Sequence, residues 1–153
     1  WRRAELGLGF TARDLPAAVG LVAAFHITLF AMMYVCDVVL PGFSRSLDGL
    51  VAGGITLSAA VAVSIVNPIF EEVFVCAYII RALERTHSTA FAVNVSVAIR
   101  VAYHLYQGPA GAMTVIPFGL MLGWWFARTG RLWPAVIAHG ILDLWALAIP
   151  EGG

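Results

Sequence analysis

Lysine is absent from the sequence, and charged residues of all kinds make up only 12% of its 153 positions. A soluble domain carries about twice that share of charge, so the composition argues against a soluble fold. Acidic and basic residues balance at nine each, which leaves no excess positive charge to attract nucleic acid. The two cysteines, Cys36 and Cys76, lie in apolar segments and are expected to be small buried residues rather than a disulfide.

Apolar residues dominate instead, at 61% of the chain, with a mean hydropathy of +0.88. This composition predicts an all-α, polytopic transmembrane helical bundle of about five spans, at about 20 residues each, embedded in membrane lipid. Little chain is left for a soluble domain. The sequence begins at Trp1 rather than Met and shows no cleavable signal peptide, so we expect an upstream segment, with room for further helices.

Five apolar segments are expected to form the spans, at about residues 15–40, 50–80, 89–106, 112–127 and 133–149. Pro68 removes the hydrogen bond to the carbonyl of Ser64 and predicts a kink in the second segment. Gly119 and Gly123 form a GxxxG pattern that permits close helix contact, although incidental glycines would look the same. We divide the chain into residues 1–48, an interfacial lead-in with the first transmembrane helix, and an intramembrane core at 49–150.

The arginines predict the orientation of the bundle. If the N-terminus is cytoplasmic, only Arg45 lies in an outer loop, and Arg100 lies within a span. The other seven arginines all fall on the inner side: Arg2, Arg3, Arg13, Arg81, Arg85, Arg128 and Arg131. This positive-inside bias favours five spans, with the C-terminus outside.

Two adjacent carboxylates, Glu71 and Glu72, interrupt the second apolar segment. Ionised carboxylates are costly to place in hydrocarbon, so an acid within a membrane segment indicates a functional site. On a helix the two side chains point about 100° apart. One can therefore face the bundle interior while the other reaches a neighbouring helix or a cavity.

Two later segments each carry a polar pair on one helical face, because the members are four residues apart: Arg100 with His104, and His139 with Asp143. If the three polar faces converge, they form an acid–base pocket inside the membrane. The expected helix boundaries leave a mismatch in depth between the carboxylates and His104, on the order of 10 Å at about 1.5 Å per residue.

Three kinds of chemistry fit such a pocket. Glutamate could act as general base for hydrolysis, with histidine as its partner. Two imidazoles and a carboxylate could hold a metal ion that acidifies a bound water. A proton-linked transporter would use the same groups as a relay. A purely structural polar network that fastens the helices remains open beside these.

The order of these motifs resembles the CPBP family of intramembrane proteases, also called Abi, which includes the type II CAAX prenyl endopeptidases. Residues 67–72 (NPIFEE) look like the first family motif. Residues 118–123 (FGLMLG), 128–134 (RTGRLWP) and His139-x-x-x-Asp143 look like the third. The resemblance covers about residues 58–147. It implies a multi-pass protein of the bacterial plasma membrane that cleaves a peptide bond of a membrane-bound peptide or protein substrate, including substrates of the CAAX-prenyl type.

The resemblance also implies roles for individual residues. One of Glu71 and Glu72 would activate the attacking water, and His104 would share that role or bind metal. His139 and Asp143 would stabilise the oxyanion or complete a metal site. A divalent ion, most simply zinc, would be held by His104, His139 and Glu72. The alternatives are a catalytically inactive scaffold or bacteriocin-immunity protein of the same fold, and a proton-linked transporter fragment.

The sequence departs from the family pattern at three positions. The pattern EExxxR has Cys76 in place of arginine, the pattern FxxxH has Arg100 in place of phenylalanine, and the third motif ends in Asp143 where asparagine is common. We hypothesise that Arg100 pairs with Glu71 or Glu72 in place of the missing arginine, because a buried arginine needs such a partner. A carboxylate at position 143 suits a metal ligand or a group that orients a histidine.

Overall fold

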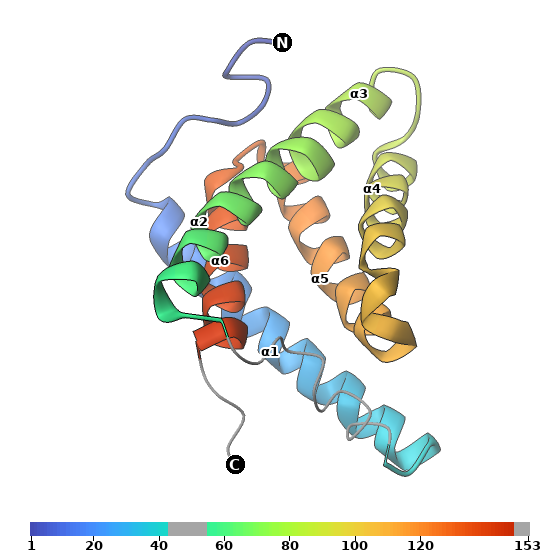
Figure 1. Ribbon diagram of the computed structural model, residues 1–153. Coiled ribbons are helices and arrows are strands. Elements are labelled where there is room, and N and C mark those ends of the chain that lie inside the picture. The colour runs from blue at the N-terminus through green and yellow to red at the C-terminus, as the bar shows by residue number, and fades with distance from the viewer. Residues whose placement is uncertain (43–54, 149–153) are drawn as a thin grey trace.

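The computed structural model describes residues 1–42 and 55–148, and within them the protein is all α-helical. The expected outer-loop Arg45 and the expected helix start near Leu50 therefore lie outside the described residues. The helical stretches are α1 Asp14–Val39, α2 Leu57–Glu71 with its continuations η2 Glu72–Ile80 and α3 Arg81–Leu83, α4 Thr89–His104 with the short turn η3 Leu105–Gln107, α5 Gly108–Thr129 and α6 Trp133–Ala148. Figure 1 shows how they are arranged.

Two of these stretches are long and apolar enough to cross a membrane. They are α1, with 26 residues, and the continuous stretch Leu57–Leu83, with 27. Helices α4 and α6 have 16 residues each, fewer than the roughly 20 that a perpendicular crossing needs. The all-α fold predicted from the sequence is confirmed, and the five-span count stays a prediction.

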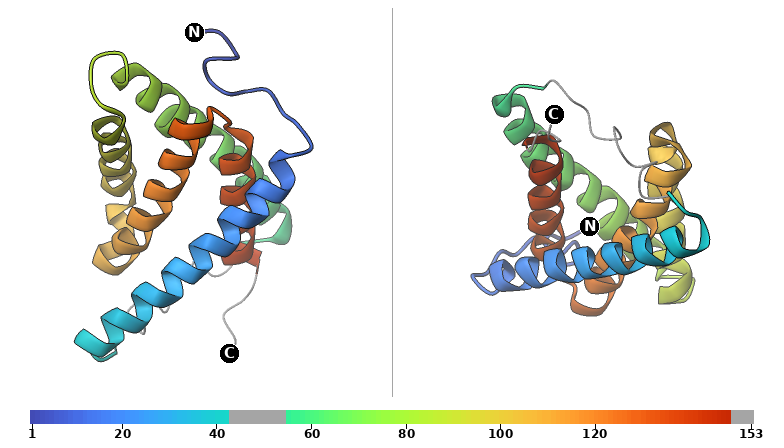
Figure 2. Two further views of the ribbon diagram at one scale, coloured as in Figure 1. Left: turned by 180° about the vertical axis from the view of Figure 1, so that it is seen from behind. Right: turned by 90° about the horizontal axis from the view of Figure 1, so that it is seen from below.

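The helices α4 and α5 pack against one side of η2, while Phe74 and Tyr78 of η2 stay exposed. Helix α4 packs against α5 and η2, while α2 packs along α6. Helix α1 crosses the bundle on one side, against α6 and α5, as the view from below in Figure 2 makes clear. Most of the buried apolar side chains form one cluster, which draws on α1, η2, α4, α5 and α6.

The contact between α2 and α6 depends on Pro68 and Gly140. Pro68 has no N–H, so the carbonyl of Ser64 lacks its usual partner within the helix. Gly140 of α6 lies against that carbonyl so closely that a Cβ at position 140 would be 2.6 Å from the Ser64 oxygen. The two helices can approach to this distance only because residue 140 has no side chain.

The GxxxG pair faces α4. A Cβ at Gly119 would lie 3.3 Å from Cδ of Arg100, and one at Gly123 would lie 3.1 Å from Cγ1 of Val93. The pattern therefore serves helix packing rather than being incidental. Its consequence for the site is that the long side chain of Arg100 can lie across the surface of α5.

Candidate functional site

The site begins where the second helix changes its geometry. Glu72 is the first residue of η2, a π-helical segment, and its side chain is completely buried. Wide turns of this kind are frequently found at functional sites. The hydroxyl of Ser96 on α4 donates a 2.9 Å hydrogen bond to the carbonyl oxygen of Val75, which attaches α4 to the wide turn.

Arg100 on α4 joins the two glutamates. Its Nη2 lies 2.8 Å from both carboxylate oxygens of Glu72, and its Nη1 lies 3.2 Å from Oε2 of Glu71. The arginine is only 1% exposed, so these charge-assisted bonds are shielded from water. The Cys76 thiol donates to Oε2 of Glu72 at 2.9 Å and lies 4.0 Å from Nη2 of Arg100. The guanidinium thus reaches the space beside position 76.

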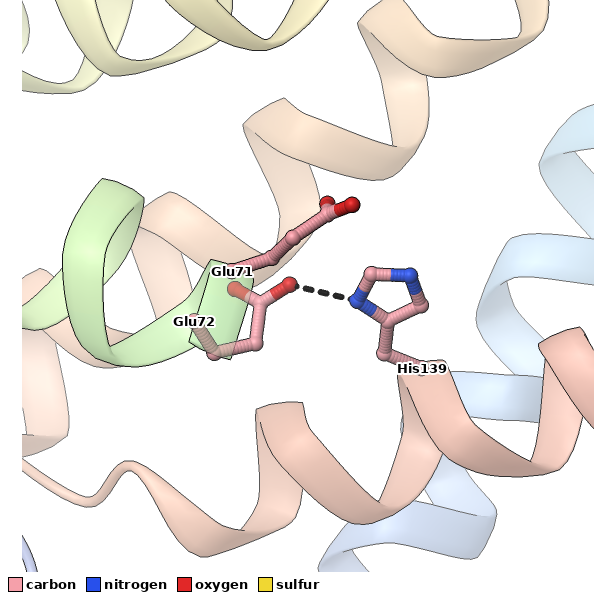
Figure 3. A group of neighbouring side chains, drawn as sticks. All are labelled: Glu71, Glu72 and His139. Atoms are coloured by element: carbon pink, nitrogen blue, oxygen red, sulfur yellow. Dashed lines mark hydrogen bonds and ion pairs between the residues drawn. The ribbon is translucent and has the colours of Figure 1, made fainter. Parts of the chain in front are cut away.

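His139 on α6 contacts the same carboxylate (Figure 3). Its Nδ1 is 2.8 Å from Oε1 of Glu72, and its Nε2 is 3.3 Å from Oδ1 of Asp143. The Asn67 amide donates to the other oxygen of Asp143 at 3.4 Å. The ring of Phe118 packs edge-on against the imidazole at 5.0 Å between centroids. The imidazole is therefore held in one orientation by two carboxylates and an aromatic ring.

Glu71 is bound on one oxygen only, among the residues that the structure describes. Its Oε2 accepts a 2.6 Å hydrogen bond from the Tyr103 hydroxyl as well as the bond from Arg100, while Oε1 has no hydrogen-bond partner there. The Glu71 side chain is 11% exposed and lines a cavity of about 240 Å³ between α2 and α4. A water molecule could reach this carboxylate, whereas Glu72 is sealed.

His104 stands apart from the cluster. Its Nδ1 lies 2.9 Å from the carbonyl oxygen of Arg100, which makes Nδ1 the N–H donor and leaves Nε2 as an acceptor. It lines a second cavity, of about 450 Å³, together with His139 and Asp143. Because His104 lies four residues beyond Arg100, it is about 6 Å further along α4 than Arg100.

The donor set suits a divalent metal ion. Ligand atoms of Glu71, Glu72 and His139 lie within 4.8 Å of one another, and within the described ranges no other group of three histidine, cysteine or acidic residues does so. Carboxylate oxygens and imidazole nitrogens are both ligands that zinc accepts. With Nδ1 bound to the ion, Nε2–H would donate to Asp143. A metal-bound histidine usually donates its other ring N–H to a carboxylate in this way. His104, expected among the ligands, is not brought into this group.

The comparison with protein-family models matches residues 53–145 to the type II CAAX prenyl endopeptidase, Rce1-like, family. The match spans more than half of the chain and runs from before α2 into α6. The chain belongs to the Rce1-like type II CAAX prenyl endopeptidase family. Its place among the CPBP proteases, expected from the motifs, is thereby confirmed. No curated protein and no solved structure matches the chain.

Every residue of the Rce1-like site described above lies inside the matched range, whereas α1 lies outside it. Helix α1 nevertheless contributes to the larger cavity, where Phe25 and Phe30 form part of the wall. The segment that precedes the family domain therefore closes one side of the site.

Sequence reasoning did not assign a role to three residues that contact the site. Tyr103 binds Glu71, Asn67 binds Asp143, and Phe118 packs on His139. The first two carried a signal in their spacing, since Asn67 is four residues before Glu71 and Tyr103 three after Arg100, each on the same helical face as its neighbour. Nothing in the spacing distinguishes Phe118 from other core aromatic residues.

Proposed function

We propose that this Rce1-like protein is an intramembrane endopeptidase that hydrolyses a peptide bond of a membrane-associated substrate. The observation that carries the proposal is the buried group formed by Glu71, Glu72 and His139, whose ligand atoms lie within 4.8 Å of one another. A carboxylate base, an imidazole and a neighbouring cavity together meet the needs of water activation. Family membership supports a peptide as the substrate.

Glu71 is the residue we assign as general base. Both oxygens of Glu72 are already occupied by Arg100, His139 and Cys76, and the side chain has no exposure. Glu71 keeps Oε1 available and borders a cavity. In the proposed step, Oε1 takes a proton from water as the water oxygen bonds to the carbonyl carbon. The protonated Glu71 then returns that proton to the amide nitrogen as the C–N bond breaks and the amine leaves. Glu72 holds the arginine and the imidazole in place.

His139 is the residue we assign to the electrophilic side of the reaction. Its two ring nitrogens both face carboxylates, so in this arrangement the ring donates from both positions and carries a positive charge. A positive imidazole favours the oxyanion that develops during attack on a carbonyl. Asp143 orients the ring, and the free Nε2 of His104 in the same cavity can accept a hydrogen bond from the substrate or the leaving amine.

A divalent metal, most simply zinc, fits the same residues. Glu71, Glu72 and His139 would hold it, with Asp143 on the far nitrogen of the imidazole. When bound, such an ion acidifies a coordinated water and polarises a carbonyl. The charges of the site are compatible with a bound ion. Three carboxylates and one guanidinium surround it, and an ion with two positive charges can take the place of the extra proton on His139.

The proposed setting is a bilayer crossed five times, with the N-terminus cytoplasmic and residues 49–150 as the catalytic core. The two long apolar helices and the family support a membrane location. The mostly apolar walls of the larger cavity favour a substrate with a hydrophobic group next to the scissile bond, of which a CAAX-type prenylated peptide is the family example.

The test is cleavage in proteoliposomes. The purified protein is incubated with a peptide that carries a farnesylated cysteine three residues before its C-terminus and with the same peptide lacking the lipid, and products are identified by mass spectrometry. We expect release of the C-terminal tripeptide from the lipidated peptide, and loss of that product in His139→Ala. The substitution Glu5→Gln, in the N-terminal segment away from the site, should not affect it. Absence of cleavage by well-folded wild-type protein would contradict the hydrolase assignment for this substrate class.

A second candidate is a catalytically inactive scaffold. The complete hydrogen bonding of Glu72 is what a purely structural network requires, so this observation favours it. The two proposals differ in what they expect of Glu71, whose free oxygen and adjacent cavity a scaffold does not need. Folded wild-type protein that cleaves neither peptide, with Glu71→Gln as stable as the wild type, would favour the scaffold.

A further inference from the structure

A groove on the outside of the bundle lies apart from the catalytic cavities. It has a volume of about 710 Å³, and none of the residues that line it lines either cavity beside Glu71 and His139. Helix α1 forms one wall with Leu21 and Thr28, and α5 forms the other with residues that include Pro117, Met121 and Trp124. The groove is largely apolar along its length and carries its charge at one end, on Arg128.

The length of the groove matches one leaflet of a bilayer. From Pro117 to Arg128 the α5 wall rises about 16 Å, at about 1.5 Å per residue. Half of a hydrocarbon core of about 30 Å is about 15 Å. An acyl chain that follows the groove from the bilayer midplane would therefore place its headgroup beside Arg128.

Arg128 is the charge that a headgroup would meet. Its guanidinium lies 5.0 Å from the ring centroid of Trp124, which holds it at the end of the groove, and it has no ion pair with any residue that the structure describes. The nearby Arg131 is different, because Asp14 neutralises it at 2.8 Å. Trp124 and Trp125 at this level are the aromatic residues expected where the acyl chains meet the headgroups.

We propose that this groove is a binding site for one anionic phospholipid, with an acyl chain between α1 and α5 and the phosphate at Arg128. The predicted orientation supports this proposal, because the positive-inside bias places the arginine-rich end that contains Arg128 on the cytoplasmic side. Arginines on that side attract anionic lipids of the cytoplasmic leaflet. A zwitterionic lipid would fill the apolar groove equally well but would lack the net charge that Arg128 complements. The proposal does not depend on peptide hydrolysis.

The test is lipid retention measured by native mass spectrometry. The protein is released from detergent micelles doped with phosphatidylglycerol or with phosphatidylcholine of the same acyl chains. We expect the wild type to retain one phosphatidylglycerol with about fivefold preference, the contribution typical of one arginine near an anionic surface. Arg128→Gln should abolish this preference, whereas Arg128→Lys should keep most of it.

Arg3→Gln is the matched control, since Arg3 is an exposed arginine of the same charged end that does not line the groove. It removes the same charge and should leave the preference intact. Met121→Trp should displace the lipid while Arg128 is still present, because it fills the groove. Equal retention of both lipids by the wild type, equal effects of the two glutamine substitutions, or undiminished lipid in Met121→Trp would each overturn the proposal.

Discussion

Replacing Arg100 with phenylalanine should destabilise the protein severely, because it removes the guanidinium that both glutamates share. Arg100 is 1% exposed and Glu72 is fully buried, so water cannot take the place of the guanidinium. Removing one partner of a buried ion pair costs about 3–5 kcal/mol. We expect Arg100→Phe to lower the free energy of unfolding by about 4 kcal/mol, or roughly a thousandfold in the folded-to-unfolded ratio.

The same defect should be repairable from η2. The Cys76 sulfur lies 4.0 Å from Nη2 of Arg100 and 2.9 Å from Oε2 of Glu72, so an arginine introduced at position 76 starts beside the carboxylate it must meet. The double variant Cys76→Arg/Arg100→Phe also restores the EExxxR and FxxxH patterns of the family. We expect it to recover more than half of the stability lost in the single variant.

Unfolding by sodium dodecyl sulfate in mixed micelles, followed by circular dichroism, measures both effects. Arg85→Gln is the control, since Arg85 is exposed and stacks on Trp1 away from the site. The hypothesis that Arg100 takes the place of the arginine missing at position 76 is refuted if Arg100→Phe unfolds at the wild-type detergent fraction. It is also refuted if the double variant is no more stable than Arg100→Phe.

Two further substitutions test the contacts around the site. Tyr103→Phe removes the 2.6 Å hydrogen bond to Glu71 and should lower the maximal cleavage rate about tenfold at unchanged KM. This is the lower end of the effect expected for a hydrogen bond to a charged group, because Tyr103 is 38% exposed. The control Tyr106→Phe, one turn further on and exposed, should have no effect, and an equal loss of rate there would contradict a positioning role for Tyr103. Gly140→Ala should lower the free energy of unfolding in detergent by about 1–3 kcal/mol, because its Cβ would lie 2.6 Å from a backbone oxygen of α2. Gly20→Ala should not lower it, because a Cβ there would have no neighbour within 4 Å. Equal stability of the two alanine variants would show that α2 and α6 do not pack as described.

The positions of the helices could be read from the sequence because apolar runs and their polar breaks mark them directly. The expected segment at 15–40 corresponds to α1 at Asp14–Val39, and the one at 133–149 to α6 at Trp133–Ala148. The π-helical turn at Glu72 could not be anticipated, since it depends on how η2 packs against α4 and α5 rather than on local preference. Pro68 indicated a disturbance one turn earlier but not its form.

The site was only partly readable because spacing defines a helical face but not the depth at which faces meet. The pairing of Arg100 with the glutamates followed from the cost of burying any of these charges alone, and the structure brings the three side chains together. His104 shares the face of Arg100, but in the structure it lines the larger cavity with His139 and Asp143 instead of joining the group formed by Glu71, Glu72 and His139. The mismatch in depth expected from the helix boundaries stays a prediction.

The most direct test of the proposed mechanism is the rate of peptide cleavage by Glu71→Gln in proteoliposomes, beside the wild type. Glutamine keeps the size of the side chain and can still bond to Tyr103, but it cannot accept a proton from water. General-base catalysis contributes about 10²–10⁴-fold, so we expect kcat to fall at least a hundredfold while detergent unfolding stays near that of the wild type. Cleavage by Glu71→Gln at the wild-type rate would contradict the assignment of Glu71 as the base.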